Sequence, residues 1–196
     1  MKYRFIILIP HRDILKPFGE FRQKLFAEGF PGAHSFPTAA PLAEVSRPFS
    51  REELKDLAGN IRKLTMENDG KIRNSGIAVA GCPDKLSFFG AVLDLPVNEN
   101  LFPQSAKNKI LHTFFRPVLC AALVPSDVDS AGESQIQEKA PALSFRAASL
   151  ANMVIRPLNA GDCGLKTGGL KTGDYSFEWK IGPPVWLPKW KGNKVF

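Results

Sequence analysis

Three histidines, His11, His34 and His112, are the side chains whose ordinary pKa lets them exchange a proton near neutral pH. A pair of imidazoles can act as general acid and general base. In an extended segment, residues two positions apart share a face, so His34 would lie on the same face as Phe36 and Thr38. This makes His34 the candidate catalytic residue, with His11 as its partner. The alternative is that all three histidines are surface or capping residues.

The cysteines and the glycine-rich segment show no spacing typical of a catalytic or metal site. Cys82, Cys120 and Cys163 are odd in number and lack Cys-x-x-Cys spacing, which argues against a disulfide framework and against zinc. Gly-Leu-Lys-Thr occurs twice within residues 161–173, but a P-loop requires Gly before the Lys and a helix after it. We therefore expect no metal, no cofactor and buried free thiols.

The composition is that of an ordinary globular protein, with 44% hydrophobic and 23% charged residues among 196. This length suits a single domain over residues 1–196. The net charge of +7 favours a polyanionic partner such as a nucleotide or RNA, and the alternative is a solvated basic surface. Lysines surround Trp186 and Trp190 near the end of the chain, and we expect both tryptophans to pack on the core.

The apolar run over residues 5–9 is too short for a signal peptide, and Pro10-His11 ends it without a small-residue cleavage site. It predicts a fully buried first strand instead. Elsewhere in the sequence, apolar runs fall short of the ~20 residues that span a bilayer. We therefore expect no membrane contact and a cytoplasmic location.

Hydrophobic periodicity predicts three helices among many strands. The first opens at Asp13 or Lys16, the second follows the capping box Ser50-Arg51-Glu52-Glu53, and the third covers residues 101–114, including His112. Extended segments are expected at residues 3–9, 33–45, 72–80, 86–95, 117–124, 144–157 and 175–181. Polar residues predict flexible loops at 126–141 and 161–174. Strands and helices that do not alternate strictly favour an α+β fold with largely antiparallel sheets.

The first two helices each carry an apolar stripe that predicts which face is buried. The stripe of the first consists of Ile14, Phe18, Phe21 and Leu25. The stripe of the second consists of Leu54, Leu57, Ile61 and Leu64.

This element order resembles the 2H phosphoesterase superfamily, which includes 2′,3′-cyclic nucleotide phosphodiesterases and 2′-5′ RNA ligase-like proteins. The similar phrases are Arg4-Phe5-Ile6-Ile7-Leu8-Ile9-Pro10, Pro41-Leu42-Ala43-Glu44-Val45, Phe115-Arg116-Pro117-Val118-Leu119-Cys120-Ala121, and the pair 148–150 and 175–179. The resemblance covers most of the chain. It implies two pseudo-symmetric lobes of antiparallel sheet, with outer helices, around a central groove that carries two His-x-Thr motifs.

By position, the resemblance places Phe36 and Thr38 in the first motif and Val118 and Cys120 in the second. Only Thr38 keeps the family's chemistry, because Phe36 and Val118 cannot move a proton. Each general acid or base contributes about 10²–10⁴-fold, so both motifs are degenerate. We therefore expect a ligand- or partner-binding protein without the usual phosphodiesterase activity.

Three alternatives remain open for the partner and the activity. An apolar groove centre favours a protein segment or a mixed aromatic ligand. A cyclic phosphodiesterase or RNA-end-processing enzyme, acting on 2′,3′-cyclic or 2′-5′ linked RNA ends, would need relocated histidines such as His34. A basic RNA-binding module would use the groove without chemistry.

Overall fold

A computed structural model of the chain describes residues 2–27, 36–81, 86–125, 142–158 and 176–187. His34, Cys82, Cys163 and the loops predicted at 126–141 and 161–174 lie outside these residues. The strands are β1 (Tyr3–Pro10), β2 (Ala40–Val45), β3 (Lys71–Gly81), β4 (Leu86–Leu93), β5 (Ile110–Thr113), β6 (Val118–Pro125), β7 (Ser144–Leu158), β8 (Ser176–Ile181) and β9 (Val185–Trp186). The α-helices are α1 (Leu15–Ala27) and α2 (Arg51–Thr65), and the 3₁₀ turns are η1 (Arg12–Ile14), η2 (Met66–Asn68), η3 (Glu99–Leu101) and η4 (Gln104–Lys109).

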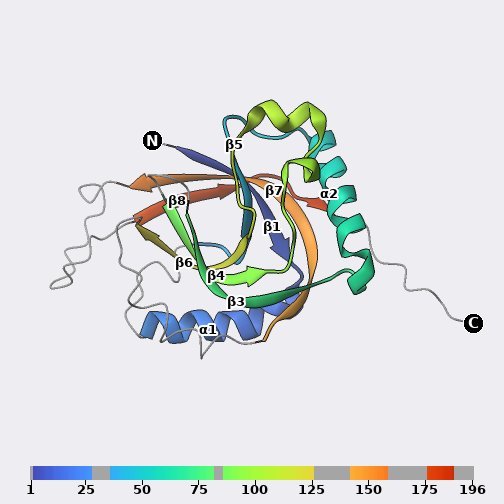
Figure 1. Cartoon of the computed structure of the whole chain (residues 1–196). Coiled ribbons are helices and arrows are strands. Elements are labelled where there is room, and N and C mark those ends of the chain that lie inside the picture. Colours follow the sequence, from blue (N-terminus) through green and yellow to red (C-terminus); the bar gives the residue numbers. More distant parts are fainter. Residues whose placement is uncertain (1, 28–35, 82–85, 126–141, 159–175, 188–196) are drawn as a thin grey trace, which may run out of the picture.

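The strands form one sheet in the order β5-β2-β1-β7-β3-β4-β6, with β8 and β9 both paired to β7. All pairings between the described strands are antiparallel, and helices cover part of the outside (Figure 1). The predicted α+β class with antiparallel pairing is therefore confirmed.

The sheet curls until its last strand returns to the strand near its start. The N–H of Phe114 donates to the carbonyl of Leu42 at 3.0 Å, and the N–H of Cys120 donates to the carbonyl of Ala39 at 3.0 Å. These two bonds hold the segment that connects β5 to β6 alongside β2 and the residue before it. The curled sheet consequently has an inner and an outer face.

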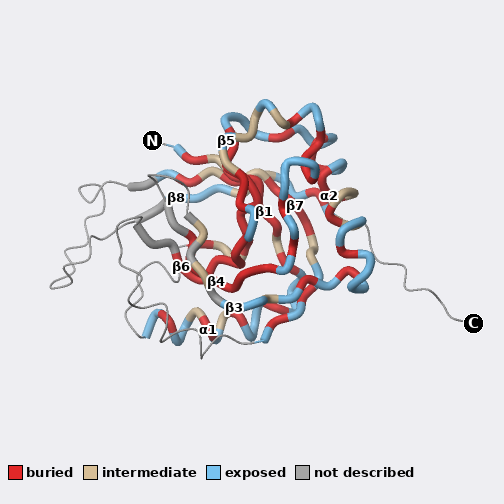
Figure 2. Tube along the Cα trace, in the orientation of Figure 1, coloured by how far each residue is buried: buried red, intermediate tan, exposed pale blue. Residues whose placement is uncertain are grey.

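Strand β1 is buried on both of these faces. Phe5 and Ile7 point to the inner face, while Ile6 and Leu8 point to the outer face, and all four are fully buried. A strand covered on both sides needs a continuous apolar run rather than alternation. The predicted buried first strand is confirmed, and Figure 2 shows its buried trace in the middle of the molecule.

Apolar side chains on the inner face form a cluster of their own, which we call the inner cluster. It consists of Tyr3, Phe5, Ile7, Phe36, Ala39, Phe88, Val92, Phe114, Val118, Cys120, Ala151, Met153 and Ile155. A larger outer core lies on the other face, and helices α1 and α2 contribute to it.

Helices α1 and α2 begin much as their sequences predict. Ser50 Oγ accepts from the N–H of Glu53, and a Glu53 carboxylate oxygen accepts from the N–H of Ser50, which completes the predicted capping box. The predicted stripe of α1 is buried in full. The predicted stripe of α2 is wrong at Leu64, whose side chain is 42% exposed. Thr65 is buried instead, because it lies nearer the centre of the buried face of the helix.

The predicted third helix over residues 101–114 is wrong. This segment contains the short turns η3 and η4, followed by β5, so His112 lies on a strand. Asn98 Oδ1 accepts from the N–H of Asn100, which holds a local turn at the start of this segment. Pairing with β2, in which His112 lies opposite Glu44, then favours the strand.

Gly90 allows β4 and β6 to approach closely, where their register shifts between Phe89 and Gly90. A Cβ at this position would overlap the carbonyl of Leu119.

We predict that Gly90→Ala lowers the free energy of unfolding by roughly 2 kcal/mol or more, because the backbone of β4 or β6 must move to make room. Urea denaturation measures this change. The control is Gly59→Ala in α2, where a Cβ meets nothing within 4 Å; it should raise stability by about 0.5–1 kcal/mol. Equal effects would contradict this account.

Candidate functional site

Three of the four motif positions lie inside the inner cluster. Phe36 and Val118 are each 1% exposed, and Cys120 is fully buried. The Phe36 ring lies edge-on to the ring of Phe88, with centroids 5.4 Å apart, and Phe88 in turn contacts Phe114 at 5.5 Å. The space around Phe36 and Val118 is thus filled with aromatic and aliphatic side chains.

Thr38, the fourth motif position, is half-buried and already bonded. Its Oγ1 accepts a hydrogen bond from Nη1 of Arg22, on helix α1, at 3.1 Å. The other terminal nitrogen of Arg22 donates to the carbonyl of Phe36 at 2.6 Å. Burial lowers the pKa of the Arg22 guanidinium, which still keeps its charge. Arg22 therefore holds the Phe36–Thr38 segment against α1, and no sequence pattern singled it out.

Cys120 is a structural thiol. Its sulfur donates to the carbonyl of Ala122 at 3.1 Å, and burial raises the pKa of the thiol well above its ordinary value, although the charge of Arg22 acts in the opposite direction. A protonated, inaccessible thiol is neither a nucleophile nor a metal ligand. Within the described residues, no three His, Cys, Asp or Glu side chains are placed to hold a metal ion.

The two described histidines lie on different elements and in different surroundings. His11 follows β1, and its Nδ1 pairs with the carboxylate of Asp13. His112 on β5 lies edge-on to the ring of Phe114, with centroids 5.0 Å apart. Each lines its own surface cavity. Pairing of His11 with His34 stays a prediction, since His34 lies outside the described residues.

We consider three surface cavities lined by described residues, and none of the four motif positions lines them. The one of ≈ 500 Å³ is lined by His11, Asp13, Arg62, Thr65, Gly70, Arg146, Ala147, Ala148, Trp186 and Leu187. A second, of ≈ 330 Å³, lies beside His112 and β5, and a third, of ≈ 280 Å³, lies on β7 and β8.

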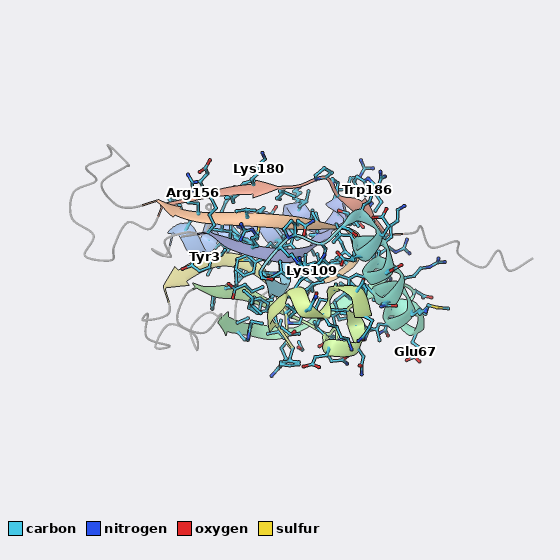
Figure 3. The ribbon with its side chains drawn as sticks, turned by 90° about the horizontal axis from the view of Figure 1, so that it is seen from above. Tyr3, Glu67, Lys109, Arg156, Lys180 and Trp186 are labelled. Carbon is cyan, nitrogen blue, oxygen red and sulfur yellow. The ribbon has the colours of Figure 1, made fainter. Side chains whose placement is uncertain are left out.

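Trp186 corrects one of the sequence predictions. We expected it to pack on the core, but it is 70% exposed, and Figure 3 shows it at the end of the molecule where α2 lies. Its strand β9 is only two residues long and pairs with β7 through Ser149 and Leu150. Val185 is the buried member of this strand, because neighbouring side chains point to opposite faces.

The ion pair between Lys109 and Glu53 is structural. Lys109 Nζ lies 2.6 Å from Glu53 Oε2, and both side chains are largely buried. Burial alone would raise the pKa of Glu53, but hydrogen bonds from Lys109 and Ser50 outweigh burial and hold the pKa below its ordinary value. The pair fastens the end of η4 to the start of α2.

Comparison with protein-family models gives no match to this chain, and comparison with curated proteins gives none either. The helices in the described part of the chain are all too short or too polar to cross a membrane.

The buried Cys120 thiol predicts a pH dependence of stability. The folded state keeps the thiol protonated, while the unfolded chain loses this proton near the ordinary pKa of 9.0. The free energy of unfolding should therefore fall above pH 9 by up to about 1.4 kcal/mol per pH unit relative to Cys120→Ala. Urea denaturation of both proteins between pH 7 and pH 10.5 measures this difference. Parallel pH profiles would show that the thiol ionises in the folded state.

Proposed function

We propose that this protein is a ligand-binding protein without phosphodiesterase activity, on a scaffold similar to the 2H phosphoesterases. The observation that carries the proposal is the closed apolar packing of Phe36 and Val118, at the positions where the family has histidine. Phosphate transfer needs proton carriers within hydrogen-bond reach of the reacting oxygens. Aromatic rings that pack against each other leave no room for a phosphate there.

The two-lobed, pseudo-symmetric arrangement is part of the same proposal. Strands β5, β2, β1 and β7 would form one lobe, and β3, β4 and β6 the other, joined by the short ladder of Lys71–Arg73 with Ser144–Arg146. One motif segment directly precedes β2 and the other begins β6. The bond from Cys120 to Ala39 brings these segments together. Two motif segments that lie side by side are what the proposed groove requires, and the inner cluster fills the space between them.

One polar side chain remains at the motif positions. Thr38 Oγ1 accepts from Nη1 of Arg22, which ties it to helix α1, and a hydroxyl alone cannot replace the two missing proton carriers. Loss of both proton carriers lowers a rate by about 10⁴–10⁸-fold if each contributes independently. These residues therefore support a phosphodiesterase activity no higher than background.

The proposal predicts no turnover. Purified protein mixed with 2′,3′-cyclic AMP or with a 2′-5′ linked oligoadenylate should release no product above a protein-free control. The matched variant is His34→Ala, which should behave as the natural chain does. Hydrolysis that disappears in His34→Ala would establish the relocated-histidine enzyme and overturn the proposal.

Restoring histidine at a motif position should damage folding and leave the protein inactive. Phe36→His removes ring contacts with Phe88 and buries an imidazole among apolar side chains, so we expect a loss of about 3 kcal/mol in the free energy of unfolding. The control is Phe115→His, 62% exposed, which should change stability by less than about 0.5 kcal/mol. Urea denaturation measures both. A stable, active Phe36→His would mean that the motif position opens to solvent.

A further inference from the structure

The cavity of ≈ 500 Å³ lies where four parts of the chain converge, outside the inner cluster. His11 directly follows β1, Arg62 lies in the last turn of α2, Arg146 at the start of β7 and Trp186 in β9. Its volume of ≈ 500 Å³ lies within the range of small-molecule sites, about 300–1,000 Å³. None of these four residues belongs to the motif positions.

Irregular pairing at the end of β1 builds this cavity. The register between β1 and β7 shifts after Ile9, and the N–H of His11 then donates to the carbonyl of Arg146 at 2.7 Å. Bulges of this kind commonly re-aim side chains beside functional sites. The next residues of β7, Ala147 and Ala148, also line the cavity, and their small side chains fill little of it.

The charges in the cavity favour an anion. Four titratable groups line it: His11, Asp13, Arg62 and Arg146. Asp13 contacts His11 and brings one carboxylate to the cavity, against two guanidinium groups. Neither arginine side chain has an acidic partner among the residues that the structure describes. Guanidinium groups of this kind are suited to bidentate recognition of a phosphate. The hydroxyl of Thr65 donates to backbone carbonyls of α2, so the arginines are the groups that would donate to a phosphate.

An exposed tryptophan at the rim adds an aromatic preference. Trp186 is 70% exposed although indole is among the largest apolar side chains. Exposed aromatic rings beside cationic grooves are typical stacking platforms for nucleic-acid bases. A ligand that satisfies both parts of the cavity therefore combines a planar ring with a phosphate group.

We infer that this cavity binds a nucleoside monophosphate, with Arg62 and Arg146 holding the phosphate and Trp186 stacking on the base. The inference rests on the proposed ligand-binding function and names its site and ligand class. The same ring-plus-phosphate chemistry is present in a free nucleotide and in the terminal nucleotide of an RNA strand. The experiment below separates these two sources.

Isothermal titration of the full chain with AMP tests the site. Arg146→Ala and Arg62→Ala should each weaken AMP binding at least tenfold, and Trp186→Ala should weaken it roughly tenfold, whereas Trp186→Phe should retain most affinity. Adenosine and inorganic phosphate should each bind much more weakly than AMP, because each engages only one part of the cavity.

Matched controls come from the third cavity, which has the same residue types. Arg156→Ala and Trp179→Ala change an arginine and an exposed tryptophan on β7 and β8, and Figure 3 shows Arg156 toward the end of the molecule opposite Trp186. Both should leave AMP affinity unchanged, and thermal unfolding should show all five alanine variants folded. Undetectable AMP binding, or equal losses in the control and cavity variants, would overturn the inference.

A single-stranded oligoadenylate distinguishes the RNA source. If the oligoadenylate binds as tightly as AMP, and Trp186→Ala lowers its affinity by the same factor, the cavity accepts the terminal nucleotide of a strand. The inference then holds for RNA as the source of the nucleotide. Oligoadenylate binding that does not change in Trp186→Ala and falls steeply with salt would place RNA elsewhere on the basic surface. If AMP also fails to bind, the inferred nucleotide site is overturned. Turnover of 2′,3′-cyclic AMP would contradict only the proposal that the protein is not a phosphodiesterase. A failure of that proposal can therefore be told apart from a failure of the inferred nucleotide site.

Discussion

The packing of one ring, that of Phe88, holds the two sides of the curled sheet together. Phe88 lies in β4, and its ring makes edge contacts with three other phenylalanine rings, those of Phe5 at 5.2 Å, Phe36 at 5.4 Å and Phe114 at 5.5 Å. Each such contact contributes about 0.5–1.5 kcal/mol beyond the burial of its area. Because the three partners come from distant segments, their packing requires β4 to lie across from β1 and β2.

This aromatic centre also decides where polar chemistry can occur. A filled inner face excludes water and phosphate, so charged groups lie at its edge or outside it. Arg22 bonds to the edge at Thr38, and Lys109 pairs with Glu53 over the outer core. Arg62 and Arg146, neither of which has an acidic partner in the described residues, border the cavity of ≈ 500 Å³. The proposed ligand site lies at this outer end of the molecule rather than at the filled centre.

Local patterns in the sequence predicted most of the elements, because such patterns depend on neighbours in the chain. The Ser50 capping box, the apolar stripe of α1 and the buried run of β1 are examples. The prediction failed at residues 101–114, where the pairing of β5 with β2 outweighs helix-like spacing. It failed for Trp186 as well, since composition cannot show which face of a two-residue strand is covered.

The sequence by itself determined the α+β class, the boundaries of most strands and the absence of proton carriers at Phe36 and Val118. Only the tertiary structure decided that these two side chains close into an aromatic cluster, and that His11, Arg62, Arg146 and Trp186 share one cavity. The physical reason is that periodicity is local, whereas these neighbours meet through register and closure of the sheet, which depend on pairing between distant segments.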